Sequence, residues 1–191
     1  GGYLSGGDFS SRSPSRHKTI LEGDIGIVGD NSDNVENIIT IDGTTGISIT
    51  EKTVIDGFIL QNGKTNKRGA GLLINAQESG VAIPNIRNCS FQNNQAGHGG
   101  AVYIDVANGG VCGSVFQDCS FSSNNANEGY GGAIYNNGLN GTFDIVFENC
   151  YFSDNEAVLE GGAIYSYGKG ISSRTKLISC SFHDNTAQVT G

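Results

Sequence analysis

Methionine and tryptophan are absent from this 191-residue chain, and proline occurs only twice. Basic residues are also scarce, because 11 Lys and Arg stand against 19 Asp and Glu and the formal net charge is -8. The densest group of basic residues is only Lys64, Lys67 and Arg68. A protein that binds a nucleic-acid backbone needs a larger positive patch, so we expect no nucleic-acid partner.

Long apolar runs are missing as well. No stretch approaches the ~20 apolar residues of a membrane-spanning helix, so we expect no transmembrane segment in these residues. Apolar residues spaced as on one face of a helix are also absent. Instead, short β-rich stretches are separated by Gly, Asn, Asp and Ser, which predicts strands joined by turns. The expected strands are 38–41, 47–49, 54–60, 71–74, 102–104, 115–116, 143–147, 163–165 and 177–182.

One pattern recurs along the second half of the chain. The string C-x-F-x-x-N-x-A occurs at 89–96, 119–126, 150–157 and 180–187, at offsets of 30, 31 and 30 residues. Between successive copies lies GGA followed by Val or Ile and Tyr, at 99–103, 131–135 and 161–165. A fixed period of this size indicates stacked repeats, in which each unit buries its apolar face against its neighbours.

Short strands repeated every 30 residues predict an all-β fold, a single-domain parallel β-helix of about five to six coils. Equivalent positions in successive coils then lie ~4.8 Å apart, the normal distance between paired strands. We expect the helix to be right-handed, because connections between parallel strands are strongly biased to that hand.

Stacking predicts three structural ladders inside the coil. The Cys and Phe of each repeat are two residues apart and should share the inward face, while the Asn should lie at a turn and form a ladder of amides. These columns are Cys89, Cys119, Cys150 and Cys180; Phe91, Phe121, Phe152 and Phe182; and Asn94, Asn124, Asn155 and Asn185.

The repeat continues toward the N-terminus in weaker form. Residues 55–62 align with 87–94 at an offset of 32 if Gly57 takes the Cys position, and 69–74 align with 99–104. We therefore divide one domain, 1–191, into an irregular leader (1–18), irregular N-terminal coils (19–84) and regular coils (85–191). The chain starts without Met and stops where another GGA strand is due, so we expect it to be part of a longer protein.

The five cysteines are expected to be buried free thiols. Ladder cysteines lie within the usual Cα separation of a disulfide, but their Cβ vectors run parallel rather than converging. A free Cys in a core behaves as a small hydrophobic residue. Cys112 lies off the ladder and could pair with Cys89 or Cys119 only if the intervening loop happened to bring them together.

The alternation of FxxN with GGA(I/V) resembles the passenger repeats of the polymorphic outer membrane proteins. The N-terminal half, through Gly1-Gly-Tyr and residues 19–26, 29–34 and 55–58, is similar to the start of large secreted β-helix surface proteins of Bacteroidetes-like bacteria. These resemblances imply a secreted or cell-surface location associated with the bacterial outer membrane, and commonly adhesion. They identify no catalytic residue.

Carbohydrate-active enzymes share the β-helix architecture, so the fold alone does not exclude catalysis. The acidic strings of polygalacturonases and the basic string of pectate lyases are absent, however, and only His98-Gly99 matches. Two rows of polar residues are expected to point outward. They could bind a cation or a sugar, or they could be ordinary solvated turn positions. The first row is Asn88, Asp118 and Asn149, and the second is Asp154 and Asp184. The three histidines, His17, His98 and His183, have no metal-ligand spacing.

One loop is a weak candidate for a metal site. Asp24, Asp30 and Asp33 place oxygen ligands in a Gly-bounded segment, which suits Ca²⁺, although the spacing of known calcium loops is missing. A turn capped by its own Asp and Asn side chains is the alternative. We expect no other cofactor and assign no catalytic residue.

The sequence therefore predicts a non-enzymatic, extracellular structural or adhesive segment of a bacterial surface protein, with a protein or a glycan as its partner. The alternatives are a polysaccharide lyase or glycoside hydrolase, and a carbohydrate-binding module without catalysis. Tyr103, Tyr135 and Tyr165 share one stack and are the candidate ligand row. They offer a sugar platform if they point outward, and a strand ladder if they are buried.

Overall fold

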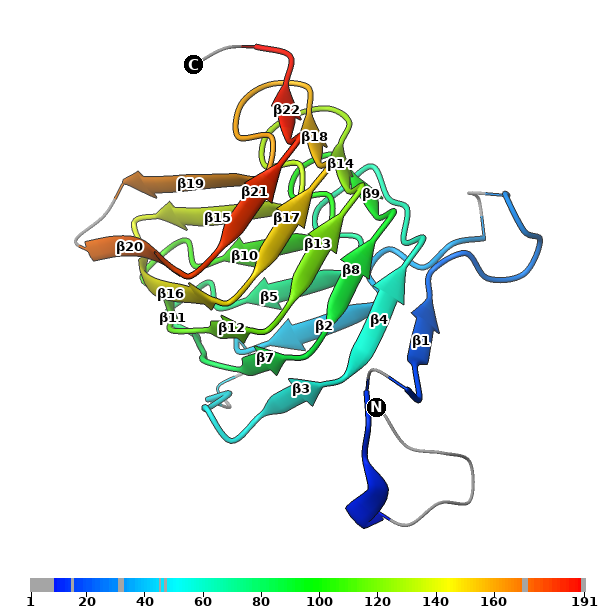
Figure 1. Cartoon of the computed structure of the whole chain (residues 1–191). Helices are drawn as coiled ribbons and strands as arrows, with labels where there is room; N and C mark the ends of the chain where they lie inside the picture. Colours follow the sequence, from blue (N-terminus) through cyan, green and yellow to red (C-terminus); the bar gives the residue numbers. More distant parts are fainter. Residues whose placement is uncertain are drawn as a thin grey trace.

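Parallel strands stacked coil upon coil make up the computed structural model, which describes residues 9–14, 16–30, 33–44, 46, 48–169 and 172–189. They form a β-solenoid of about five turns (Figure 1). The described part contains one short 3-10 turn, Phe9–Ser11, and no α-helix. None of the helical structure found there is long and apolar enough to cross a membrane.

The strands of successive coils form four parallel sheets, here called A to D. Sheet A contains β1 (Thr19–Glu22), β4 (Phe58–Gln61), β8 (Ser90–Gln92), β13 (Ser120–Ser122), β17 (Tyr151–Ser153) and β21 (Ser181–His183). Sheet B contains β2 (Ile39–Asp42), β5 (Leu72–Asn75), β10 (Val102–Asp105), β15 (Ile134–Leu139) and β19 (Ile164–Lys169).

Sheets C and D complete the coil. Sheet C contains β3 (Val54–Asp56), β6 (Val81–Ala82), β7 (Asn85–Arg87), β11 (Val111–Cys112), β12 (Val115–Gln117), β16 (Thr142–Glu148) and β20 (Ser172–Ile178). Sheet D contains β9 (Gln95–Ala96), β14 (Asn125–Ala126), β18 (Glu156–Ala157) and β22 (Thr186–Ala187). The chain passes from C to A, D and B and returns to C, so the parallel β-solenoid is confirmed. Its right-handed winding stays a prediction.

The corner between sheets C and A requires a left-handed backbone. The residue just before each ladder Cys has a positive φ, 53° at Asn88 and 51° at Ser179. Asn and Gly adopt this conformation at the lowest cost. The predicted strands 54–60 and 177–182 are therefore each broken in two at this corner. Of the predicted strand 47–49, Ile49 forms one bridge to Ala82, and residue 47 lies outside the described residues.

The same corner corrects the alignment of the N-terminal coil. Leu60 pairs with Phe91, an offset of 31 rather than 32. Gly57, with φ 77°, donates its N–H to the Arg87 carbonyl and thus occupies the position of Asn88, not that of Cys89. The sequence alignment matched Gly57 to Cys89 by counting residues along the repeat. In the structure, Gly57 lies at the corner instead, because that position requires a residue that accepts a positive φ.

Aromatic rings fill the interior in two columns. Successive rings of the predicted Phe ladder stack with centroids 4.9, 4.7 and 4.8 Å apart, from Phe91 to Phe182. A second column, which the sequence analysis missed, contains Phe116 and Phe147 at 5.0 Å. Phe147 meets Phe121 edge-on at 6.3 Å, so the two columns interlock in a favoured aromatic geometry.

The Asn column forms a buried amide ladder with no exposed surface at Asn94, Asn124 and Asn155. Nδ2 of Asn124 donates to Oδ1 of Asn155 (2.9 Å) and to the Phe91 carbonyl (3.0 Å). Oδ1 of Asn124 accepts from the backbone N–H and from Nδ2 of Asn94, both at 3.1 Å. Each mid-ladder amide therefore satisfies its two donor hydrogens and both acceptor lone pairs.

The two glycines of each GGA string have different roles. The first, Gly131 in the second string, has φ 69°, which a side chain would strain. At the second, a Cβ built on Gly132 would lie 2.0 Å from the carbonyl oxygen of Gly162. The paired glycines thus allow one coil to touch the next through its backbone, and the Ala that follows is buried, as at Ala133.

All five cysteines are free thiols, as predicted. Cys89, Cys119 and Cys150 are buried in one column, and Cys180 in the last described coil is half-buried. Burial raises the pKa of the Cys119 thiol, which donates to the Ile86 and Gln117 carbonyls. Cys112 lies in β11 and contacts the Ser114 hydroxyl at 3.2 Å.

Phe121→Ala should lower the free energy of unfolding by about 3–5 kcal/mol, because it removes a fully buried ring from the middle of a stack. The matched control is Phe182→Ala, since Phe182 ends the same column and is 43% exposed. Urea unfolding followed by circular dichroism measures both. Equal losses for the two variants would contradict the stacked core.

Asn155→Ala should cost at least about 1–3 kcal/mol, because it removes the donor to the Phe121 carbonyl and the acceptor of both the backbone N–H and Nδ2 of Asn124. Asn66→Ala, at an exposed loop position, is the control and should change stability by less than about 0.5 kcal/mol. If Asn155→Ala unfolds at the urea concentration of the parent chain, the ladder does not stabilise the fold.

Candidate aromatic face and lateral groove

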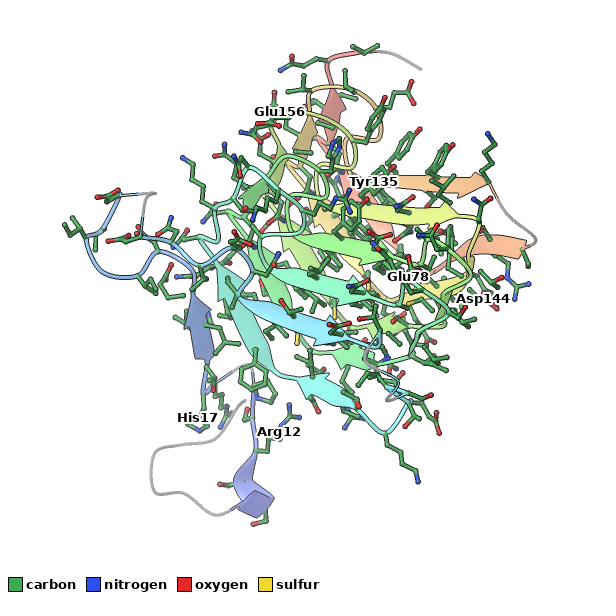
Figure 2. The ribbon with its side chains drawn as sticks, turned by 180° about the vertical axis from the view of Figure 1, so that it is seen from behind. Arg12, His17, Glu78, Tyr135, Asp144 and Glu156 are labelled. Atoms are coloured by element: carbon green, nitrogen blue, oxygen red, sulfur yellow. The ribbon has the colours of Figure 1, made fainter. Side chains whose placement is uncertain are left out.

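Tyr103, Tyr135 and Tyr165 occupy one column on sheet B. The parallel register pairs Tyr103 with Tyr135 and Tyr135 with Tyr165, and the ring centroids are 4.9 and 5.3 Å apart. Their strand neighbours Val102 and Ile104 belong to the core cluster, so the tyrosines point to the outer face. Tyr103 is 3% exposed, whereas the other two are half-buried (Figure 2 labels Tyr135).

The ring faces in this column are largely occupied. Tyr135 lies between Tyr103 and Tyr165, and the Arg68 guanidinium lies 5.0 Å from the centroid of the Tyr103 ring. A sugar stacked flat on the middle of the column therefore has no open ring face. Ring edges and hydroxyl groups remain. Burial raises the pKa of Tyr135 to about 12, so its hydroxyl stays protonated and able to donate at neutral pH.

A second column beside the tyrosines was missed by the sequence analysis. It consists of the residue that precedes each GGA-like string, and its members are Arg68, His98, Tyr130 and Glu160. The Tyr130 ring lies 5.8 Å from the His98 ring and 4.6 Å from the Tyr165 ring. The repeat itself could have predicted this column, because the position before Gly-Gly-Ala recurs with the same period although its residue type varies.

His98 links the two columns. Its Nδ1 accepts the backbone N–H of Tyr130 at 3.3 Å, and its ring lies 5.8 Å from the Tyr135 ring. Burial lowers the pKa of His98, and the positive charge of Arg68 lowers it further against the opposing effect of Glu128. Gly129 leaves room for the His98 ring, because a Cβ built on Gly129 would lie 2.2 Å from the imidazole.

Two adjoining hollows follow the loop that connects the sheet D side to sheet B. One, of about 400 Å³, is lined by Lys67, Arg68, Leu73 and His98, and the other, of about 380 Å³, by Lys64, Gln95 and Asn127 among others. Glu36 lines both. We call the two together the lateral groove. It contains all three members of the basic cluster noted in the sequence.

The two predicted rows of outward polar residues occupy the two corners beside sheet A. Asn88, Asp118 and Asn149 are exposed, with φ between 52° and 53°, and Asp154 and Asp184 lie at the next corner with φ 55° and 51°. Nδ2 of Asn149 donates to Oδ1 of Asp118 at 3.2 Å. The backbone conformation of the corners accounts for these Asn and Asp residues without a ligand.

The segment predicted as a candidate calcium loop is held partly by its own side chains. Oδ2 of Asp24 accepts the Gly29 N–H (2.9 Å), and Oδ2 of Asp33 accepts the Ile27 N–H (2.8 Å). Among the described residues, their Oδ1 atoms have no hydrogen-bond partner and are buried. Across the described residues, however, no three His, Cys, Asp or Glu side chains are grouped so as to hold a metal. The Ca²⁺ site at Asp24, Asp30 and Asp33 stays an untested prediction.

The histidines lie on separate elements. His17 is in the turn before β1, His98 borders the lateral groove, and His183 is in β21, where its ring lies 5.4 Å from the Tyr151 ring. The structure thus brings His98 alone to the aromatic face.

The columns and corners define a repeat solenoid whose interior is conserved from coil to coil and whose outer positions vary. A family model for the Chlamydia polymorphic membrane protein repeat matches residues 88–105, 118–137 and 149–167. Each matched segment contains one FxxN string and the GGA that follows it, so these coils are repeats of that type, as the sequence indicated. Proteins of that family are surface proteins of the bacterial outer membrane.

Searches of curated proteins and of solved structures found no match. The matched segments begin at residue 88. The resemblance of the N-terminal half to secreted Bacteroidetes-type proteins therefore stays a prediction.

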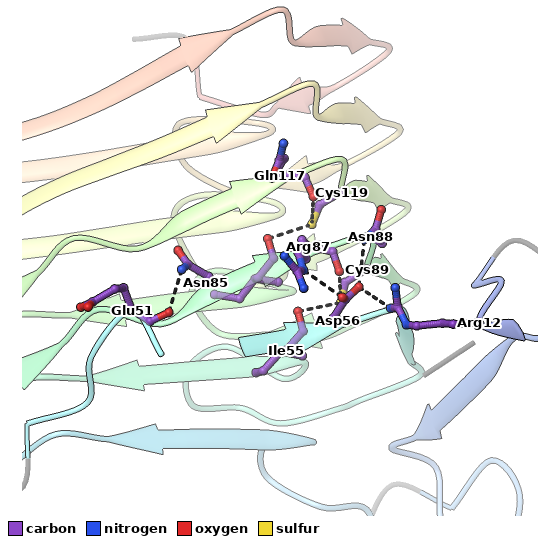
Figure 3. Close-up of polar contacts among 11 residues, drawn as sticks. Arg12, Glu51, Ile55, Asp56, Asn85, Arg87, Asn88, Cys89, Gln117 and Cys119 are labelled. Carbon is purple, nitrogen blue, oxygen red and sulfur yellow. Dashed lines mark hydrogen bonds and ion pairs between the residues drawn. The ribbon is translucent and has the colours of Figure 1, made fainter. Parts of the chain in front are cut away.

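Asp56 pairs with Arg87 in the strand register, one residue before the corner, and joins the leader to the solenoid (Figure 3). Its carboxylate accepts from Nε of Arg87 (2.8 Å), from Nδ2 of Asn88 (2.9 Å) and from the guanidinium of Arg12 in the leader. Burial raises the pKa of Asp56, but the hydrogen bonds from Asn88, Arg87 and Arg12 together lower it more, and the net pKa lies below its usual value.

A lowered pKa in the folded state means that the ionised Asp56 stabilises the fold above the unfolded pKa of about 3.9. This contribution should disappear as the pH falls through the lower, folded pKa. Asp56→Asn should therefore reduce the difference in unfolding free energy between pH 7 and about pH 3, measured by urea unfolding. Arg12→Gln and Arg87→Gln should each remove part of the same difference. An unchanged pH profile in Asp56→Asn would contradict the assignment.

Proposed function

We propose that this chain is an extracellular, non-enzymatic segment of a bacterial surface protein, which holds a variable outer face on a rigid repeat and uses it for adhesion. The observation that carries the proposal is the match of three successive coils to the polymorphic membrane protein repeat. Proteins with that repeat are surface proteins of the outer membrane, which supports the same location for this chain.

The geometry supports display rather than catalysis. The acidic candidates at the corners stand in separate rows, and the backbone conformation explains them at Asp118, Asp154 and Asp184. A glycoside hydrolase needs two carboxyl groups facing one another across the scissile bond. The outer columns, by contrast, gather Tyr and Arg, residue types that are frequent at the centres of binding surfaces.

A carbohydrate-binding module is the second candidate. The observation in its favour is the lateral groove beside the tyrosine column. The groove is lined by lysine, amide and imidazole groups. Such a groove suits recognition of a polar ligand and requires no catalytic group.

Beads coated with the purified chain should bind saturably to cultured epithelial cells, and free chain should compete. In parallel, the chain should release neither reducing ends nor unsaturated sugars from polygalacturonate or alginate. Beads coated with Tyr135→Ala/Tyr165→Ala are the matched comparison and should bind less, because both side chains are half-exposed on the outer face. Turnover of either polymer would overturn the non-enzymatic assignment, and beads that bind no better than uncoated ones would overturn the adhesive role.

A further inference from the structure

The basic cluster of this acidic chain lies on one turn of the solenoid. Lys64 is bridged to Gln95 and Arg68 to His98 in the next coil, so the cluster spans the turn that joins the sheet D side to sheet B. All three basic side chains line the lateral groove. In a chain with a formal charge of -8, this is a local exception that requires an explanation.

The acids nearby leave these cations available. Lys67 pairs with Glu36, but both side chains are 63% exposed, and a surface pair of this kind contributes little and exchanges readily. Arg68 is different, because it pairs at 2.8 Å with Asp105, whose side chain is 3% exposed. That bond and the Tyr103 ring fix the guanidinium, which remains 51% exposed and retains further N–H donors.

The groove also contains unsatisfied acceptors. Oδ1 of Asn34 and Oδ1 of Asn127 are buried and have no hydrogen-bond partner among the described residues. Both residues line the half of the groove that holds Lys64. A buried carbonyl oxygen without a partner is unfavourable, and a turn of either amide toward the groove would let its oxygen accept from a ligand that brings hydroxyl donors to this half.

We propose that the lateral groove binds an acidic oligosaccharide, with sugar carboxylates on Lys64, Lys67 and Arg68 and sugar hydroxyls on Asn34 and Asn127. A uronic acid chain combines the two kinds of group that the groove requires. Inorganic phosphate or sulfate supplies the negative charge but lacks the alcohol donors, and a neutral sugar supplies the donors but lacks the charge. This inference rests on the proposed display function and specifies the ligand class of the same outer face.

The probe is a defined oligogalacturonate, titrated calorimetrically into the whole chain, with neutral oligogalactose of equal length as the comparison. The acidic probe should bind, and the neutral probe should bind at least about tenfold more weakly. Added salt should lower the affinity for the acidic probe. Lys64→Ala/Lys67→Ala should lower the affinity by about tenfold or more, because it removes two charge-assisted contacts, one at half-buried Lys64 and one at exposed Lys67. Lys64→Arg/Lys67→Arg should restore it.

Two further variants separate binding from folding. Lys52→Ala/Lys176→Ala removes two exposed lysines on the sheet C side and should leave the affinity unchanged. Glu36→Gln should raise it, since Glu36 competes with the ligand for Lys67. The proposal is overturned if oligogalacturonate does not bind, if the neutral sugar binds equally well, or if Lys64→Ala/Lys67→Ala binds like the parent chain. If coated beads still adhere to cells when one of these results is obtained, the proposed adhesive function stands and only the glycan site is refuted.

Discussion

The buried amide ladder is the constraint on which the rest of this solenoid depends. Asn124 has no exposed surface, and its side-chain amide makes hydrogen bonds both to the coil before it and to the coil after it. A slip of one residue between coils would leave these groups unpaired in the interior, where each unsatisfied group costs about 1–3 kcal/mol. The ladder therefore holds neighbouring coils in one register, and the stacked rings such as Phe121 depend on that register.

The register that aligns the interior also aligns the exterior. Because every coil repeats with the same phase, residues 30 to 32 positions apart become neighbours on the outer face, as Tyr103 and Tyr135 do. The interior repeats Cys, Phe and Asn in its three ladders from residue 89 to residue 185, whereas the position before each GGA-like string carries Arg68, His98, Tyr130 or Glu160 in turn. A repeat of this design can change its surface chemistry coil by coil while the core that supports it stays constant.

Much of the fold was predictable because its determinants are local and periodic. The spacing of the Cys, Phe and Asn residues predicts the coil, the parallel sheets and the free thiols without any other information. The alignment at Gly57 was wrong because a string comparison weighs residue type, whereas the corner selects residues that accept a positive φ. The second aromatic column, Phe116 and Phe147, was missed because Ile86 fills the equivalent place in the preceding coil.

The sequence by itself determined the architecture, since period, glycine placement and strand propensity act within one coil and recur in the next. Only the tertiary structure decided which outer side chains meet. The lateral groove joins Glu36, Lys64 and Asn127, which come from three different coils, and Arg68 reaches Tyr103 across the coil boundary. Such contacts depend on where each loop lies around the solenoid and on how the coils stack, and neither quantity is encoded in the spacing of a motif along the chain.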